Sequence, residues 1–203
     1  MDEVTEIDLE SAIAGVYLVL AELLDTLPES GWDTPSLCER WRVRGVVAHM
    51  SMPVRYSPEQ FGAELQACGG DFTRLSKTLA GRDAALPVDV LVGNLRDETL
   101  HAWTPPGGGT TCALNHVVIH GLDITVPLGA SRRSPDGTIR AVLDDLTVGG
   151  THTHFGFDLD GINLQATDLD WSFGSGTPTT GAAGDLALFV CGRKLPAGRI
   201  DGI

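Results

Sequence analysis

Residues 111–127 have the strongest consequences for the fold, because a helix built from them would be apolar nearly all the way round. Its polar side chains gather on one narrow arc, which holds His116, His120 and Asp123. A helix that is apolar on its other faces is normally buried inside a protein, since a surface helix needs a wide polar face. We therefore predict a central helix over 111–127, with other helices packed around it.

The two histidines of this helix are placed to bind one metal ion together. A spacing of four residues puts His116 and His120 on the same face, about 40° apart around the axis. A third histidine, His49, lies in a second apolar run that predicts a helix over 43–55. A helical bundle can place His49 opposite the pair, and three imidazoles with one open position are typical of a catalytic zinc site. Imidazole also binds nickel and iron(II), so the ligands leave the identity of the ion open.

Other side chains near these histidines allow two interpretations each. Asp123 is a candidate hydrogen-bond acceptor for a ligand histidine, or an ordinary helix-surface or capping aspartate. Cys112 lies close to the histidine helix and could line the same cavity, although packing as a small hydrophobic side chain is the simpler interpretation. His152 and His154 would share one face of a strand, but glycines and threonines around them favour an exposed loop.

Hydrophobic periodicity predicts an N-terminal bundle followed by a small mixed unit. Leucines and other apolar residues at helical spacing begin after Asp8, a candidate N-cap. The predicted helices before residue 131 span roughly 8–27, 43–55, 58–80 (one helix interrupted at Gly69-Gly70, or two), 88–103 and 111–127. After it we expect a helix over 138–148, strands at 162–166 and 171–173, and a helix over 182–192. The fold class is therefore α+β, with a metal-binding four-helix bundle over 1–150 and a small α/β domain over 151–203.

The net charge and the spacing of the cysteines indicate which partners and which cellular compartment to expect. The net charge is −13, from 27 acidic and 14 basic residues, so we expect no nucleic acid and no anionic membrane as partner. The four cysteines form no CxxC pair, which argues against a disulfide framework and suits a reducing compartment. The acidic start does not resemble a signal peptide, and no apolar stretch is long enough to span a bilayer. We therefore expect a cytoplasmic protein.

Four segments in chain order resemble the mycothiol-dependent maleylpyruvate isomerase family, which belongs to the DinB-like metal-binding superfamily. They are Gly31-Trp-Asp-Thr-Pro-Ser-Leu-Cys-Glu-Arg-Trp-Arg-Val-Arg-Gly-Val-Val-Ala-His49, His116-Val-Val-Ile-His-Gly-Leu-Asp123, Ala166-Thr-Asp-Leu-Asp-Trp-Ser-Phe-Gly174 and Gly184-Asp-Leu-Ala-Leu-Phe-Val-Cys-Gly-Arg193. The resemblance implies a DinB-like four-helix bundle with a divalent metal, usually zinc, followed by a small α/β domain. The ligand positions of the family map onto His49, His116 and His120.

The resemblance also implies a chemistry. The thiol of mycothiol would take the open position on the metal as a thiolate, because a bound cation lowers the pKa of a thiol. That thiolate could be transferred to an electrophile, or add to a cis double bond and so assist isomerisation. Arg193 resembles the family arginine that could hold a substrate carboxylate, and a cationic end to the last helix is the alternative interpretation. The isomerase pattern tends to have a glutamate where His116 stands, so here the metal charge would be one unit less neutralised.

Two other functions stay open at this point. A metal-dependent hydrolase would need a general base, and no glutamate accompanies the histidines. A non-catalytic metal-binding or small-molecule-binding module, for instance in a stress response, would need no base and no turnover. The leading hypothesis is an enzyme, a mycothiol-dependent S-transferase or isomerase. Its partners would be a small-molecule thiol and an electrophilic substrate, and we expect a monomer or a homodimer.

Overall fold

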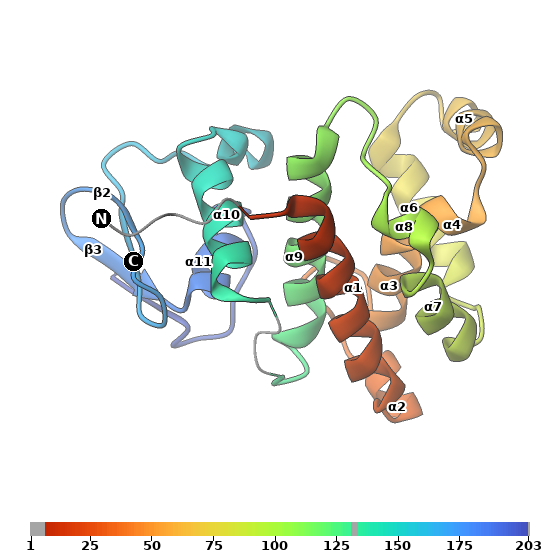
Figure 1. The fold of residues 1–203 in the computed structure, drawn as a ribbon, viewed down its shortest axis with the longest axis horizontal. Helices are drawn as coiled ribbons and strands as arrows, with labels where there is room; N and C mark the ends of the chain where they lie inside the picture. Colours follow the sequence, from red (N-terminus) through yellow and green to blue (C-terminus); the bar gives the residue numbers. More distant parts are fainter. Residues whose placement is uncertain (1–6, 131–133, 203) are drawn as a thin grey trace.

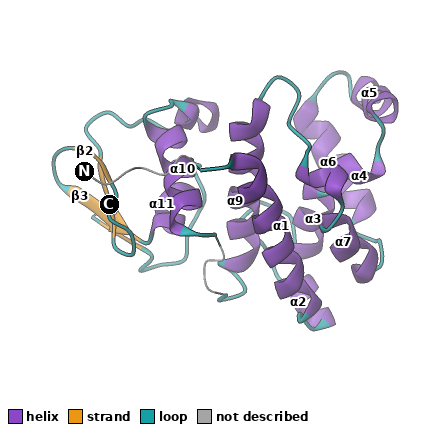
Figure 2. Ribbon diagram, in the orientation of Figure 1, coloured by secondary structure: helices purple, strands orange, loops and turns teal. Residues whose placement is uncertain are grey.

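Helices make up most of the chain, and the strands are confined to its C-terminal part (Figures 1 and 2). The computed structural model describes residues 7–130 and 134–202. The helices before the central gap are α1 (Leu9–Asp25), α2 (Glu29–Trp32), α3 (Val43–Met50), α4 (Met52–Arg55), α5 (Pro58–Ala67), α6 (Phe72–Asp83), α7 (Val88–Leu95), α8 (Glu98–His101) and α9 (Gly109–Thr125). After it come α10 (Asp136–Thr147), the 3₁₀ helix η1 (Thr151–Phe155), β1 (Asn163–Ala166), β2 (Ser172–Gly174), β3 (Pro178–Gly181), α11 (Ala183–Val190) and β4 (Ile200–Asp201).

Four helices enclose the N-terminal core in a ring, in which α1 packs on α9, α9 on α3, α3 on α7, and α7 on α1. Helix α1 begins as predicted, because the Asp8 carboxylate accepts hydrogen bonds from the first-turn amides of Glu10 and Ser11. Its buried side chains recur at helical spacing and face the ring. Helix α6 packs on the outside of α3. The predicted bundle is confirmed.

Helix α9 is the central helix that the sequence indicated. Most of its residues are buried, on faces that contact α1 and α3 on one side and α10 and α11 on the other. It therefore belongs to both parts of the fold, as Figure 1 shows. One continuous cluster of buried apolar side chains runs through the bundle helices, α10, α11 and β1.

Two predicted helices are divided in the structure, and the segment 58–80 forms the two helices that the sequence allowed as one alternative. The segment 43–55 breaks at Ser51 into α3 and α4, because Pro53 has no backbone N–H and is accommodated only in the first turn of a new helix. The segment 88–103 breaks before α8, where the Asp97 side chain accepts from the Thr99 amide and starts a new helix. The glycine pair separates α5 from α6, since both residues adopt positive φ.

The C-terminal sheet has the strand order β2-β1-β3-β4. Strand β1 pairs antiparallel with β2 and parallel with β3, and β4 pairs antiparallel with β3. The sequence predicted β1, β2 and α11 but not β3 and β4. These two strands are short and carry no alternating apolar pattern, so only their pairing defines them. The expected loop at 152–154 is part of the 3₁₀ helix η1.

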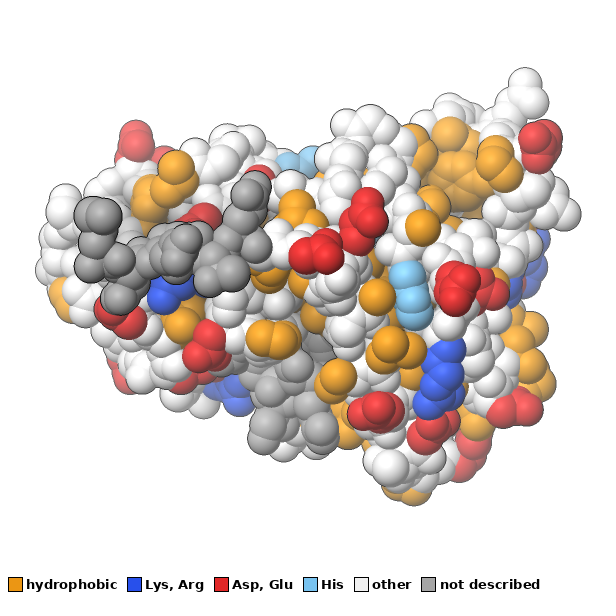
Figure 3. Space-filling view, viewed as in Figure 1, with side chains coloured by type: hydrophobic (Ala, Val, Ile, Leu, Met, Phe, Trp, Pro, Cys, Tyr) orange, Lys and Arg blue, Asp and Glu red, His pale blue; other side chains and the backbone are white. Residues whose placement is uncertain are grey.

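The fold class is confirmed as helical N-terminal part plus small α/β C-terminal part. Helix α10, which the sequence assigned to the bundle side of residue 150, packs mainly on α11 and also on α9. The division into 1–150 and 151–203 stays a prediction. Acidic side chains are spread over the face shown in Figure 3, in keeping with the net charge of −13. Among the helices of the described residues, none is long and apolar enough to cross a membrane.

Candidate metal centre

Helices α3 and α9 bring the three predicted histidines together. Nε2 of His49 lies 3.3 Å from Nε2 of His116, although 67 residues separate them in the chain. The ring centroids of the three imidazoles lie 4.8 to 5.2 Å apart, and one ring nitrogen from each falls within 4.8 Å of the others. Two nitrogen ligands of a tetrahedral zinc ion, each at about 2.0–2.1 Å, stand about 3.3 Å apart. The spacing of His49 and His116 therefore suits a shared cation.

Burial favours the neutral form of two of these imidazoles, those of His49 and His116. His49 is only 6% exposed. Desolvation lowers the pKa of His49 and of His116 well below the ordinary value, and the neighbouring imidazoles lower both further. A metal ligand must offer an unprotonated nitrogen, so the site is prepared for a cation without first losing protons at neutral pH.

His120 is oriented by Asp123, one turn further along α9. Its Nδ1 lies 3.0 Å from Oδ2 of Asp123, whose side chain is fully buried. An ionised carboxylate can only accept hydrogen bonds, so Nδ1 of His120 carries the hydrogen. The lone pair is then on Nε2, which is the nitrogen left for a metal. Asp123 is thus a hydrogen-bond acceptor for the candidate ligand His120, in line with one of the two interpretations of the sequence.

Asp123 also binds an arginine and a cysteine from distant parts of the chain. Arg193 donates from Nε to Oδ1 at 2.8 Å and from Nη2 to Oδ2 at 3.0 Å. The thiol of Cys38 lies 2.9 Å from Oδ2. Burial by itself raises the pKa of Asp123, but the hydrogen bonds from His120 and Arg193 outweigh it and hold the pKa at about 2. The carboxylate is therefore charged at every pH at which the protein would work.

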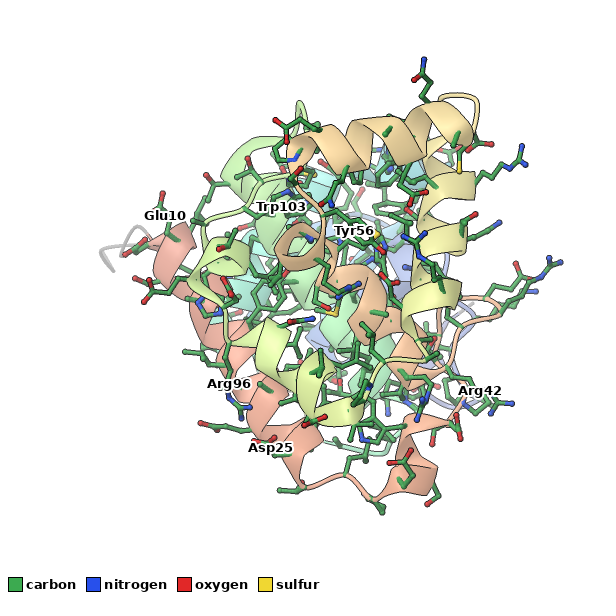
Figure 4. All side chains as sticks on the ribbon, turned by 90° about the vertical axis from the view of Figure 1, so that its right-hand side faces the viewer. Glu10, Asp25, Arg42, Tyr56, Arg96 and Trp103 are labelled. Carbon is green, nitrogen blue, oxygen red and sulfur yellow. The ribbon has the colours of Figure 1, made fainter. Side chains whose placement is uncertain are left out.

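The loop between α2 and α3 contributes two side chains that the sequence did not single out. Cys38 reaches Asp123, and the indole of Trp41 packs at 5.0 Å on the ring of His49. Trp103, which follows α8 and is labelled in Figure 4, packs at 5.7 Å on the ring of His116. Cys38 and Trp41 both lie in the segment 31–49 that carries the family resemblance, which was the available signal. Their contacts join residues far apart in the chain, so helical periodicity could not reveal them.

An arginine supports the end of α3 that carries His49. Arg55 donates from Nη2 to the carbonyl oxygen of Ala48 at 2.5 Å and from Nη1 to that of Ser51 at 3.1 Å. The same guanidinium pairs with the buried carboxylate of Asp83 at 3.1 Å. The Ala48 carbonyl oxygen belongs to the last turn of α3, where carbonyl oxygens lack partners within the helix, so the arginine satisfies it and supports that turn.

The other side chains that the sequence offered, His152, His154 and Cys112, lie outside the three-histidine cluster. Among the described residues, two groups of side chains could share a metal, the three histidines and the neighbouring set of Cys38, His120 and Asp123. Neither His152 nor His154 belongs to a group, and His152 instead contacts the carbonyl oxygen of Leu146 at 2.9 Å. Cys112 is half-buried on α9 and belongs to neither set.

Comparisons with known proteins agree with the fold of the chain. Residues 19–56 match the family model of the mycothiol maleylpyruvate isomerase N-terminal domain. The crystal structure of the mycothiol-dependent maleylpyruvate isomerase has a TM-score of 0.60 with this chain at 14% identity, covering 98% of this chain and 95% of that chain. A mutant of that enzyme gives 0.59 at 15% identity, covering 96% and 93%. A search of curated proteins finds no match.

The match runs through nearly the whole chain, so both parts of the fold occur together in the similar structures. The family model covers the end of α1, the loop that carries Cys38 and Trp41, and helix α3 with His49. The resemblance to the mycothiol-dependent maleylpyruvate isomerase family that the sequence motifs indicated is confirmed. At 14–15% identity, the structural similarity establishes the fold and leaves the reaction of this chain to be inferred from its site.

Proposed function

We propose that this chain is a divalent-metal-dependent enzyme that uses a low-molecular-weight thiol, mycothiol, either to form a conjugate by adding the thiolate sulfur to an electrophile or to assist a cis–trans isomerisation. The observation that carries the proposal is the convergence of His49, His116 and His120 in a fold similar to a mycothiol-dependent isomerase. We further propose that the metal is zinc. Three imidazole ligands fit that ion and leave a position for an exogenous ligand.

The residues of the chain fit a bound cation on three independent grounds. The nitrogens of His49 and His116 already stand at the separation of two tetrahedral ligands. Their pKa values are lowered by burial, so both rings are neutral. The third ring, of His120, is held in the tautomer that leaves Nε2 free. A divalent cation bound there would lower the pKa of a thiol and so supply the nucleophilic thiolate at neutral pH.

Arg193 is the residue that we propose for substrate contact. It lies after α11 and reaches α9 through its ion pair with Asp123, whose carboxylate also binds Nδ1 of His120. Nε and Nη2 bind the aspartate, so a substrate carboxylate would meet a guanidinium that is already oriented. Because a guanidinium is planar and permanently charged, this orientation costs less when substrate binds than ordering a free side chain would.

A metal-dependent hydrolase is the less well supported alternative. It would need a carboxylate able to accept a proton from water near neutral pH. The carboxylate placed closest by the described contacts is Asp123, whose pKa of about 2 makes it a weak base and whose oxygens are occupied by Arg193, His120 and Cys38. The geometry therefore favours thiol chemistry over water activation.

The test is a thiol-dependent assay on the metal-loaded protein. Zinc-loaded protein is given monochlorobimane together with mycothiol, glutathione or no thiol, and conjugate formation is followed by fluorescence. We expect a faster rate with mycothiol than in either other arm. The variant His120→Ala should lose bound metal and activity together, whereas His152→Ala, outside the site, should keep both. A metal-loaded protein without any thiol-dependent rate would contradict the enzyme proposal and favour a binding module.

A further inference from the structure

The thiol of Cys38 lies behind His120, on the side of the ring away from the metal position. Its Sγ is 3.5 Å from Nδ1 of His120, whereas Nε2 is the nitrogen left for a metal. The function proposed above assigns nothing to this cysteine. The thiol does not belong to the group formed by the three histidines, and burial raises its pKa, which disfavours a nucleophilic thiolate at neutral pH.

We propose that Cys38 is a positioning residue of the three-histidine site, whose thiol holds the Asp123 carboxylate in the orientation that binds Nδ1 of His120. Oδ2 of Asp123 receives three donors, which are the thiol at 2.9 Å, His120 Nδ1 at 3.0 Å and Arg193 Nη2 at 3.0 Å. Arg193 alone fixes the plane of the carboxylate. The thiol adds a second donor from another part of the chain. Oδ2 of Asp123 is therefore held both by the loop before α3, through Cys38, and by the segment after α11, through Arg193.

The ring of His120 differs from the other two in having a hydrogen-bond partner on the nitrogen that faces away from the metal position. The remote nitrogens of His49 and His116 are buried and have no hydrogen-bond partner among the described residues. Among the three candidate ligands, His120 is therefore the one whose orientation depends on a hydrogen bond in this part of the structure. Loss of such an outer partner typically costs about 10–100-fold in metal affinity. A change at Asp123 or its donors should accordingly appear first in metal binding.

The loop that carries Cys38 is built to place it. The Leu37 amide donates to the carbonyl oxygen of Asp123 at 3.1 Å, so the loop is attached to α9 one residue before the thiol. Ser36 closes the loop on itself, with both its amide and its hydroxyl bonded to the carbonyl oxygen of Trp41. Arg40 turns the chain at φ 70°, which is a conformation costly for a residue with a side chain. These hydrogen bonds of the loop therefore fix the position of the Cys38 thiol.

The experiment compares Cys38→Ala with Cys38→Ser in the full-length protein. Zinc affinity is measured by competition with a chromogenic chelator, so the readout does not depend on the proposed activity. We expect Cys38→Ala to bind zinc about 10-fold more weakly and Cys38→Ser, which keeps a donor, to stay within about threefold of the unmodified protein. Cys112→Ala removes a half-buried thiol on α9 outside the cluster and should leave zinc affinity unchanged.

A second readout separates positioning from general destabilisation. The ¹⁵N shifts of the His120 ring in the metal-free protein report which nitrogen carries hydrogen. We expect Nδ1–H in the unmodified protein and in Cys38→Ser, and a mixture of tautomers in Cys38→Ala and in the size-matched Cys38→Val. Unchanged zinc affinity and tautomer in Cys38→Ala and Cys38→Val would overturn the inference, as would a serine variant as defective as the alanine variant. These outcomes concern metal binding, so they are distinct from a failure of thiol-dependent turnover.

Discussion

Asp123 and Arg193 are 70 residues apart in the chain and meet in a two-point ion pair, with Nε on Oδ1 at 2.8 Å and Nη2 on Oδ2 at 3.0 Å. The pair joins α9, which carries two of the candidate ligands, to the segment after α11 in the C-terminal part. The aspartate is fully buried and the arginine side chain is 20% exposed. A contact between the two parts of the fold thus lies directly behind the candidate metal centre.

Removal of the Asp123 charge should destabilise the protein. Asp123→Asn leaves Arg193 partly buried without its counter-ion, and we expect a loss of about 3 kcal/mol in the free energy of unfolding, measured by urea denaturation. Asp25→Asn is the control, because Asp25 pairs with Arg96 at the exposed edge of α1 (Figure 4) and should cost under about 1 kcal/mol. Equal losses of unfolding free energy in the two variants would contradict the expectation that the buried pair stabilises the protein more than the exposed pair.

Replacement of His116 by glutamate should make stability depend more strongly on metal. The half-buried ring of His116 packs against those of Trp103 and His49. A carboxylate there is a suitable ligand when zinc is present but an uncompensated buried charge when it is absent. We expect His116→Glu to retain one equivalent of zinc and to show a wider gap in Tm between the metal-loaded and metal-free forms. A gap no wider than that of the unmodified protein would contradict a shared metal at this position.

The metal-free protein should lose stability as the pH falls below about 6.5. Burial lowers the pKa of His49 and His116 in the folded state, so below the unfolded value the unfolded chain binds more protons than the folded one. This contribution is fully present above pH 6.5 and declines by about 1.4 kcal/mol per pH unit for each histidine until its folded pKa is reached. Urea denaturation with a chelator at pH 7.5, 6.5 and 5.5 measures the slope. The double variant His49→Gln, His116→Gln should show a shallower slope, and an unchanged slope would refute the assignment.

Gly174 should tolerate no side chain. It ends β2 at φ 79°, and a Cβ there would lie 1.9 Å from the carbonyl oxygen of Ile162. Gly174→Ala must therefore displace the start of β1 as well as strain the turn. The control is Gly161→Ala, where φ is similar at 72° but no atom lies within 4 Å, so only the conformational cost of about 1–2 kcal/mol applies. We expect a clearly larger fall in Tm for Gly174→Ala, and comparable falls would contradict the steric argument.

The local sequence pattern was sufficient to predict the helices whose buried residues recur at helical spacing. The apolar run around His116 and His120 predicted the central helix, and its narrow polar arc predicted which side chains face one another. The capping aspartate and apolar spacing of α1 predicted that helix in the same way. Each of these features depends on residues within a few turns of one another, so the sequence by itself determined them.

Tertiary structure decided the features that join distant segments. Cys38 and Asp123 are 85 residues apart, and their contact depends on a loop attached to α9 by the Leu37 amide. The same is true of β3 and β4, which are too short to show a period and exist through pairing. The sequence determined that three histidines and a helix to carry two of them are present. Packing decided that His120 is held by a carboxylate, which a cysteine and an arginine hold in turn, because hydrogen-bond partners depend on position in space and not on spacing along the chain.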